Sequence, residues 1–155
     1  MKICTFLFAL LVTCLFTSSS VSAQTTRPLL TAYYGVKDAL VATDAAKAQK
    51  NAAELLKQTN AVKLEGLSVA AKKSLTDLKA EVGRLGKTTE VSAQRKHFEA
   101  VSKDMIALLK ATGPAKAYVQ FCPMAKASWL SNKKEIANPY YGSQMLTCGK
   151  VTEEI

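Results

Sequence analysis

The sequence predicts an all-α protein, an up-and-down four-helix bundle with an irregular C-terminal tail packed against it. Three observations support this fold class. Apolar residues recur every three or four positions through most of the chain, residue types that begin or end helices fall between the apolar series, and the pattern stops at Gly113 and Pro114. Short connections between successive helices favour antiparallel neighbours, which is the arrangement of an up-and-down bundle.

Each predicted helix has its own end signals. Asp44 can cap the second helix, Gly83 and Gly86 can close the third, and Thr88 or Thr89 can cap the fourth. In every helix the apolar positions fall on one face with polar residues between them, so we expect those faces to meet in a single core. The predicted helices span residues 27–43, 44–60, 66–84 and 89–112, and the tail spans residues 115–155.

Residues 1–23 have the features of a secretory signal peptide. Lys2 precedes the apolar run Ile3–Phe16, and small residues at the end of the segment form a cleavage site of the A-x-A kind. The run is shorter than the roughly 20 apolar residues that span a bilayer. We therefore expect a periplasmic or otherwise exported protein with one domain over residues 24–155 and no stable membrane insertion after cleavage. The residues before Cys14 leave a lipoprotein as the alternative.

The charge pattern and the absence of catalytic motifs narrow the classes of function. The chain has a net charge of +9, and most of the positive charge comes from lysines scattered singly along it. In an exported protein this pattern indicates a solvated surface, and we expect no nucleic-acid partner. No Cys-x-x-Cys, no glycine-rich phosphate loop and no Gly-x-Ser-x-Gly occurs. We therefore predict a binding protein and not an enzyme.

The tail contains two pairs of sulfur residues in mirrored order. They are Cys122 with Met124, and Met145 with Cys148. Pro123 favours an extended chain, in which residues two apart face the same side, and residues three apart share a face in a helical turn. The four sulfur atoms could therefore converge. Thiolates and thioethers together select soft ions, above all Cu(I), so these four residues are the predicted metal ligands.

Two other interpretations of the tail stay open at this point. A Cys122–Cys148 disulfide is the structural alternative, worth roughly 3.5 kcal/mol in the chain-entropy model, with the methionines as packing residues. His97 is the only histidine, and we keep it as an additional metal ligand, although a lone histidine beside an apolar helix stripe is more often a boundary residue. Three aromatic residues are expected to anchor the tail to the bundle, namely Trp129, Tyr140 and Tyr141.

Several strings of the tail resemble a known family. They are YVQFCPMA, WLS, EIANPYYG and MLTCG, together with QRKHFEAVSK from the fourth predicted helix. These strings resemble an exported domain family of unknown function that also occurs at the C-terminus of periplasmic adaptor subunits of copper- and silver-type heavy-metal efflux pumps. The resemblance runs from about Leu29 to Val151. It implies an envelope location and a heavy-metal efflux adaptor or another envelope protein as partner.

The leading hypothesis from the sequence is an exported protein that binds Cu(I) or Ag(I) for sequestration or for handover to heavy-metal efflux. The first alternative is a structural or interaction domain of the cell envelope with the disulfide and no metal. A third interpretation is a docking module that recognises a partner through exposed tail aromatics.

Overall fold

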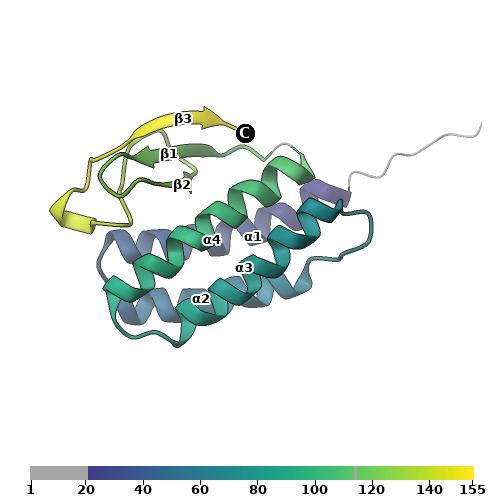
Figure 1. The fold of residues 1–155 in the computed structure, drawn as a ribbon, viewed down its shortest axis with the longest axis horizontal. Coiled ribbons are helices and arrows are strands. Elements are labelled where there is room, and N and C mark those ends of the chain that lie inside the picture. The colour runs from purple at the N-terminus through teal and green to yellow at the C-terminus, as the bar shows by residue number, and fades with distance from the viewer. Residues whose placement is uncertain (1–20, 114) are drawn as a thin grey trace, which may run out of the picture.

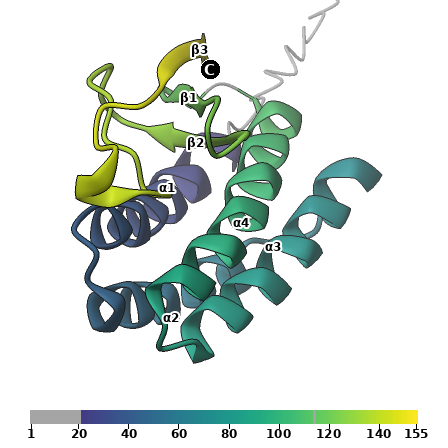
Figure 2. The same ribbon diagram turned by 60° about the vertical axis from the view of Figure 1, so that its left-hand side comes forward.

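A computed structural model describes residues 21–113 and 115–155 of the chain. Figure 1 and Figure 2 show four helices as the main body, each running back beside the one before, with a small sheet lying across α1 and α4. The elements in chain order are α1 (Val21–Val41), α2 (Ala45–Ala61), α3 (Val69–Lys87), α4 (Val91–Thr112), β1 (Tyr118–Cys122), β2 (Ala127–Ser131), the 3-10 turn η1 (Gly142–Gln144) and β3 (Lys150–Glu154).

The prediction of four helices is confirmed, and several predicted ends shift. Asp44 caps α2 by accepting a hydrogen bond from the Lys47 amide at 2.9 Å. The two glycines expected to close the third helix lie inside α3, because Gly86 packs against α2, where a methyl group in place of its hydrogen would sit 3.5 Å from Ala52 Cβ. The residue before α4 is Glu90, which makes no side-chain cap, so the expected threonine cap is wrong.

The N-terminal prediction is largely outside the described residues. Of the predicted signal peptide, residues 1–20 lie outside them, and Val21–Ala23 form the first turn of α1. Within the described chain, no helix combines the length and the apolar character needed to cross a bilayer.

The core is built from the apolar stripes that the sequence predicts. Each of the four helices contributes fully buried side chains, and the short strands add to the same cluster. The largest fully buried side chains of the cluster are Trp129, Tyr33, Phe98, Leu40, Leu55, Leu75, Leu78, Leu85, Met105, Leu109 and Leu130. Helices and strands together thus bury one continuous apolar cluster.

The tail is not irregular, which corrects the predicted fold class. Its strands form an antiparallel sheet in the order β2-β1-β3, with Gln120 opposite Trp129 and Cys122 opposite Ala127. Side chains alternate between the faces of a strand, so these four residues share one face of the sheet. The segment 132–149 lies beside that face, and Gln120 Nε2 donates to three consecutive carbonyls, those of Lys133, Lys134 and Glu135, at 2.9–3.2 Å.

Strand β3 is an edge strand, and all of its residues are exposed. Its register with β1 shifts between Val119 and Gln120, which marks a bulge, and the Thr152 hydroxyl donates to the Val119 carbonyl at 3.2 Å. Lys110 of α4 pairs with Glu153 at 2.5 Å. A bulge and charged residues both discourage pairing with another chain, so this edge is protected against aggregation.

One hydroxyl group connects the sheet to two helices. Tyr33 of α1 is fully buried, stacks on Phe98 with 5.2 Å between ring centroids, and its Oη lies 2.7 Å from Ser102 Oγ of α4. The same Oη accepts a hydrogen bond from the Leu130 amide of β2 at 3.1 Å. That amide lies on the outer edge of β2, so the tyrosine satisfies a backbone donor that the sheet leaves unpaired. Burial raises the pKa of Tyr33 well above its usual value, and the hydroxyl stays neutral.

We predict that Tyr33→Phe lowers the free energy of unfolding by about 1–3 kcal/mol, because it leaves the buried Leu130 amide without its acceptor and removes the hydrogen bond to Ser102. Urea unfolding monitored by circular dichroism measures the change. The control is Tyr34→Phe, since among the described residues the buried Tyr34 Oη has no hydrogen-bond partner. That change should be neutral or slightly stabilising. Equal losses for the two variants would show that the Tyr33 hydroxyl does not connect the layers.

Candidate functional site

The two cysteines of the tail meet at one end of the sheet. Phe121 of β1 is paired with Lys150 of β3, so the residues that follow β1 and precede β3 come together. Cys122 is fully buried, Cys148 is half-buried, and their Sγ atoms lie 2.9 Å apart without a disulfide. The structure therefore brings two thiols from 26 residues apart into direct contact.

The two thiols have different acidities. Burial raises the pKa of the Cys122 thiol, but hydrogen bonds from the Cys148 thiol and from the Ala125 amide, which lies 3.4 Å from the sulfur, outweigh it, and the pKa falls below its usual value. The same contact with Cys122 raises the pKa of Cys148. As pH rises, Cys122 therefore loses its proton first, and Cys148 holds the proton that the pair shares.

Both methionines of the predicted site lie in the turns that carry the cysteines. Met124 follows Cys122 in the β1–β2 turn, where its carbonyl accepts a hydrogen bond from Tyr141 Oη at 3.3 Å and its side chain is 60% exposed. Met145 is 39% exposed, and its carbonyl accepts from the Cys148 amide at 3.0 Å. Both methionines are accessible to solvent, whereas Met105 is buried in the core.

Asn138 holds the Cys148 segment in place. Its side chain is fully buried, with Nδ2 donating to the Cys148 carbonyl at 2.8 Å and Oδ1 accepting from the Tyr140 amide at 2.8 Å. Its backbone amide donates to the Leu146 carbonyl at 2.9 Å, and its carbonyl accepts from the Gly142 amide at 3.0 Å. One residue therefore fixes both sides of the turn that ends at Cys148.

Arg95 of α4 fastens this turn to the helices. Its Nε donates to the Pro139 carbonyl at 3.0 Å, while Nη2 donates to the Leu40 carbonyl at the end of α1 and to Thr43 Oγ1. Burial lowers the pKa of Arg95, which nevertheless stays charged at neutral pH because arginine starts far above it. The Leu40 carbonyl also accepts a hydrogen bond from the Thr43 amide at 3.1 Å, so the guanidinium group shares this acceptor with the backbone at the end of α1.

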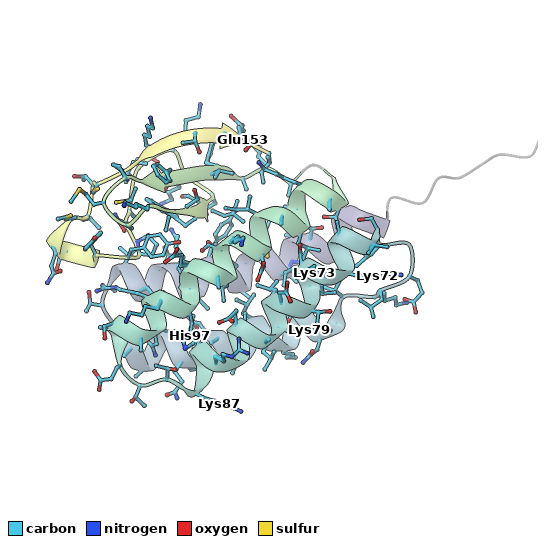
Figure 3. The ribbon with its side chains drawn as sticks, in the orientation of Figure 1. Lys72, Lys73, Lys79, Lys87, His97 and Glu153 are labelled. Carbon is cyan, nitrogen blue, oxygen red and sulfur yellow. The ribbon has the colours of Figure 1, made fainter. Side chains whose placement is uncertain are left out.

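The structure places His97, the additional ligand that the sequence suggested, against α3 and not beside the cysteine pair. His97 Nδ1 lies 3.0 Å from Glu81 Oε2 of α3, and Figure 3 shows it on the part of α4 that faces α3. Arg95, two residues earlier, faces the tail. Because each residue of an α-helix turns by about 100°, His97 points about 200° away from Arg95 and hence away from the sulfur atoms.

Sequence reasoning missed two of these positioning residues. Asn138 carried a signal, because Asn before Pro favours a turn in which the side chain bonds the backbone two residues on. Arg95 carried none, since nothing in the sequence distinguishes it from an exposed helix cation. The predicted aromatic anchor is present: Trp129 is fully buried in the common core, and the Tyr140 ring lies 6.1 Å from that of Phe98 in α4.

Across residues 21–113 and 115–155, no three or more His, Cys, Asp or Glu side chains are grouped so that they could hold a metal ion. The candidate site is therefore the pair of cysteine sulfur atoms, with no nitrogen or oxygen ligand beside it in such a group among the described residues.

Comparison with known proteins gives one match. The family described as "Protein of unknown function (DUF3347)" matches residues 29–117. The match covers most of α1, the other three helices and the link to β1, and it ends before Cys122, whereas the sequence suggested a resemblance as far as Val151. Neither a curated protein nor a solved structure matches the chain. The relation to efflux adaptors stays a prediction.

The docking of the tail can be tested at Gly142. This residue has φ of +57°, and a methyl group on it would lie 2.6 Å from Thr43 Oγ1, 2.7 Å from Arg95 Nη2 and 3.0 Å from the Val41 carbonyl. We predict that Gly142→Ala costs about 2–4 kcal/mol, because overpacking adds to the cost of a left-handed backbone.

The control for this change is Gly66→Ala. Gly66 also has positive φ, at +76°, but nothing lies within 4 Å of an added methyl group. It should therefore cost only about 1 kcal/mol, the backbone contribution alone. Urea unfolding of both variants measures the difference, and similar costs at the two positions would contradict the close packing of η1 on the α1–α2 connection.

Proposed function

The chain belongs to the DUF3347 family, whose function is unknown, and we propose from its site that it is an exported protein that binds a soft monovalent ion, Cu(I) or Ag(I). The role would be sequestration of the ion or handover to a heavy-metal efflux system. The observation that supports this most strongly is the contact between the Cys122 and Cys148 sulfur atoms, 2.9 Å apart, between two turns that each carry an exposed thioether.

The donor set favours a soft ion. Two thiols with Met124 and Met145 beside them offer only sulfur, and soft sulfur donors prefer Cu(I), whereas Zn(II) gains little from thioethers. Two thiolates bound to one tetrahedral ion at about 2.3 Å would lie roughly 3.7 Å apart, so the sulfur atoms would separate slightly on binding. Cys148 can supply that movement, because it is half-buried in a turn and Cys122 is fixed in β1.

The difference in acidity between the two thiols suits stepwise uptake of a metal ion. A thiol must lose its proton to ligate a metal ion. Cys122 has the lowered pKa and would provide the first thiolate, and the ion would then displace the proton held by Cys148. The neighbouring amide of Ala125 donates to the Cys122 sulfur and would stabilise its negative charge in the bound form.

Exposed methionines support transfer of the ion to another protein. Thioethers that served only as packing would gain by being buried, and Met105 shows that arrangement in the core. Met124 and Met145 instead remain open to solvent, where a partner's ligands could reach the ion. Such a partner, a heavy-metal efflux adaptor or another envelope protein, and the exported location rest on the sequence features of residues 1–23 and of the tail.

Titration of the reduced protein with Cu(I) against a competing chelator tests this function. We expect one ion per chain, loss of binding in Cys122→Ser with Cys148→Ser, and binding about tenfold weaker in Met124→Leu with Met145→Leu, which corresponds to about 1.4 kcal/mol. Met105→Leu and His97→Gln are matched controls and should bind as the unchanged protein does. Stoichiometric binding that survives the double serine substitution would refute the site.

A disulfide is the second candidate, and the same distance favours it. Sulfur atoms at 2.9 Å need only a small further approach to the roughly 2.05 Å of a disulfide bond. The bond would staple the Cys148 turn to β1 in a structural or interaction domain that binds no metal.

Mass spectrometry of unreduced protein from its own compartment separates the two functions. A loss of two hydrogens that persists whatever the copper supply supports the staple. Free thiols, or a mass increase equal to one copper or silver ion, support the metal site.

A further inference from the structure

One side of α3 carries a row of lysines. Lys72, Lys79 and Lys87, with Thr76 and Gly83 between them, fall within an arc of about 80° when each residue turns by about 100°. We call this row the α3 stripe. Lys72 and Lys87 are exposed and Lys79 is half-buried. Figure 3 shows the three lysines along α3, and Figure 2 shows α3 on the side of the bundle away from the sheet.

The carboxylates of α3 do not neutralise the α3 stripe. Asp77 pairs with Lys73, and Glu81 pairs with Arg84 and with His97 of α4. Both carboxylates lie more than about 100° round the helix from the centre of the stripe. Among the described residues, none of the three stripe lysines forms an ion pair within 4.0 Å, since the cations that pair with these carboxylates within α3 are Lys73 and Arg84. Positive charge is therefore segregated on this face.

Exposed apolar side chains lie at the N-terminal end of the same face. Val69, the first residue of α3, lies three positions before Lys72 and is 86% exposed. Leu64, in the α2–α3 connection, is 47% exposed and adjoins the exposed Lys63. The other large apolar side chains that are exposed in the described chain lie in the tail, near the cysteines. The α3 stripe is thus preceded by the exposed Val69 on the same face of the helix and by the exposed Leu64 in the connection before it.

We propose that this face of α3 rests on an anionic membrane surface. Lysines near such a surface are attracted to lipid phosphates, and their aliphatic stems can lie along the apolar boundary. Val69 and Leu64 would enter the boundary between headgroups and acyl chains, as apolar residues of interfacial helices do. The sulfur site would then face away from the membrane, because the sheet lies on the other side of the helices.

The composition of the face favours lipid over nucleic acid. Single-stranded nucleic acid is bound through aromatic side chains that stack on bases, and α3 contains no aromatic residue. An exposed valine and leucine gain nothing from a phosphate backbone, but they are removed from water at a lipid interface. This interaction is separate from metal binding and does not depend on it.

Sedimentation with vesicles tests the proposal. The protein without its signal peptide should bind vesicles that contain phosphatidylglycerol, bind pure phosphatidylcholine vesicles much less, and be released by salt. Lys72→Glu with Lys79→Glu and Lys87→Glu should weaken binding at least about tenfold, since each lysine contributes to the attraction. The matched control, Lys116→Glu with Lys133→Glu and Lys150→Glu, has the same net charge and should keep most of the binding.

The apolar contribution has its own variant, Val69→Ser, which leaves the charge unchanged and should weaken vesicle binding without affecting helix content by circular dichroism. Three results would overturn the proposal. They are no binding to anionic vesicles, an equal loss in the two triple variants, which would mean that net charge alone acts, and stripe-dependent binding to DNA or heparin without binding to vesicles.

Discussion

The Tyr33 hydroxyl group holds the sheet to the helices, and the sulfur site depends on that attachment. Three strands of five residues have little stability alone and need a helix layer to bury one face. The hydroxyl lies at the point where this layer forms, accepting from the edge amide of Leu130 and contacting Ser102 of α4. Because both partners are buried, an apolar ring in its place would leave the Leu130 amide unsatisfied and remove the hydrogen bond to Ser102. Sheet position, and therefore the position of Cys122 in β1, follows from this contact.

A second layer of polar contacts then fixes Cys148. The segment 132–149 has no strand ladder of its own, so its backbone groups need other partners. Gln120 supplies a donor to three of its carbonyls, and Asn138 supplies both a donor and an acceptor at the turn. Arg95 adds the connection to α1 and α4. The thiol contact is thus set by amide and guanidinium groups and not by apolar packing alone.

The helices could be predicted because their signal is local and repeated, whereas the sheet could not. Strand β3 reads Lys150–Glu154 with every residue exposed, so no alternation of apolar and polar residues marks it. Its conformation comes from pairing with β1, which is a tertiary effect. Gly86 shows the same limit inside a helix, because contact with Ala52 outweighs the tendency of glycine to end one. In both places long-range packing decided the structure.

Convergence of the cysteines was predictable from residue type, and the helix face of His97 was not. The Cys-Pro pair required an extended chain, and β1 indeed ends at Cys122, which places the sulfur at the end of a rigid strand. A histidine beside an apolar stripe of α4 can face α3 or the tail. Helix geometry sets the angle between His97 and Arg95, but the sequence does not tell that Arg95 contacts the tail, and so it does not tell which way His97 faces.

The residues of the tail fall into two groups, those that hold its conformation and those whose side chains have no such role. Asn138 bonds both sides of its turn, Gly142 fits against Thr43 and Arg95, and Gly149 fits against Trp129, where a methyl group would lie 2.9 Å from the ring. Packing or hydrogen bonding explains why each of these three residues occupies its position, without a ligand. The Met124 and Met145 side chains have no such role, since both are exposed, and the Cys148 thiol contacts the Cys122 thiol. Function in the tail is therefore best sought in its sulfur atoms.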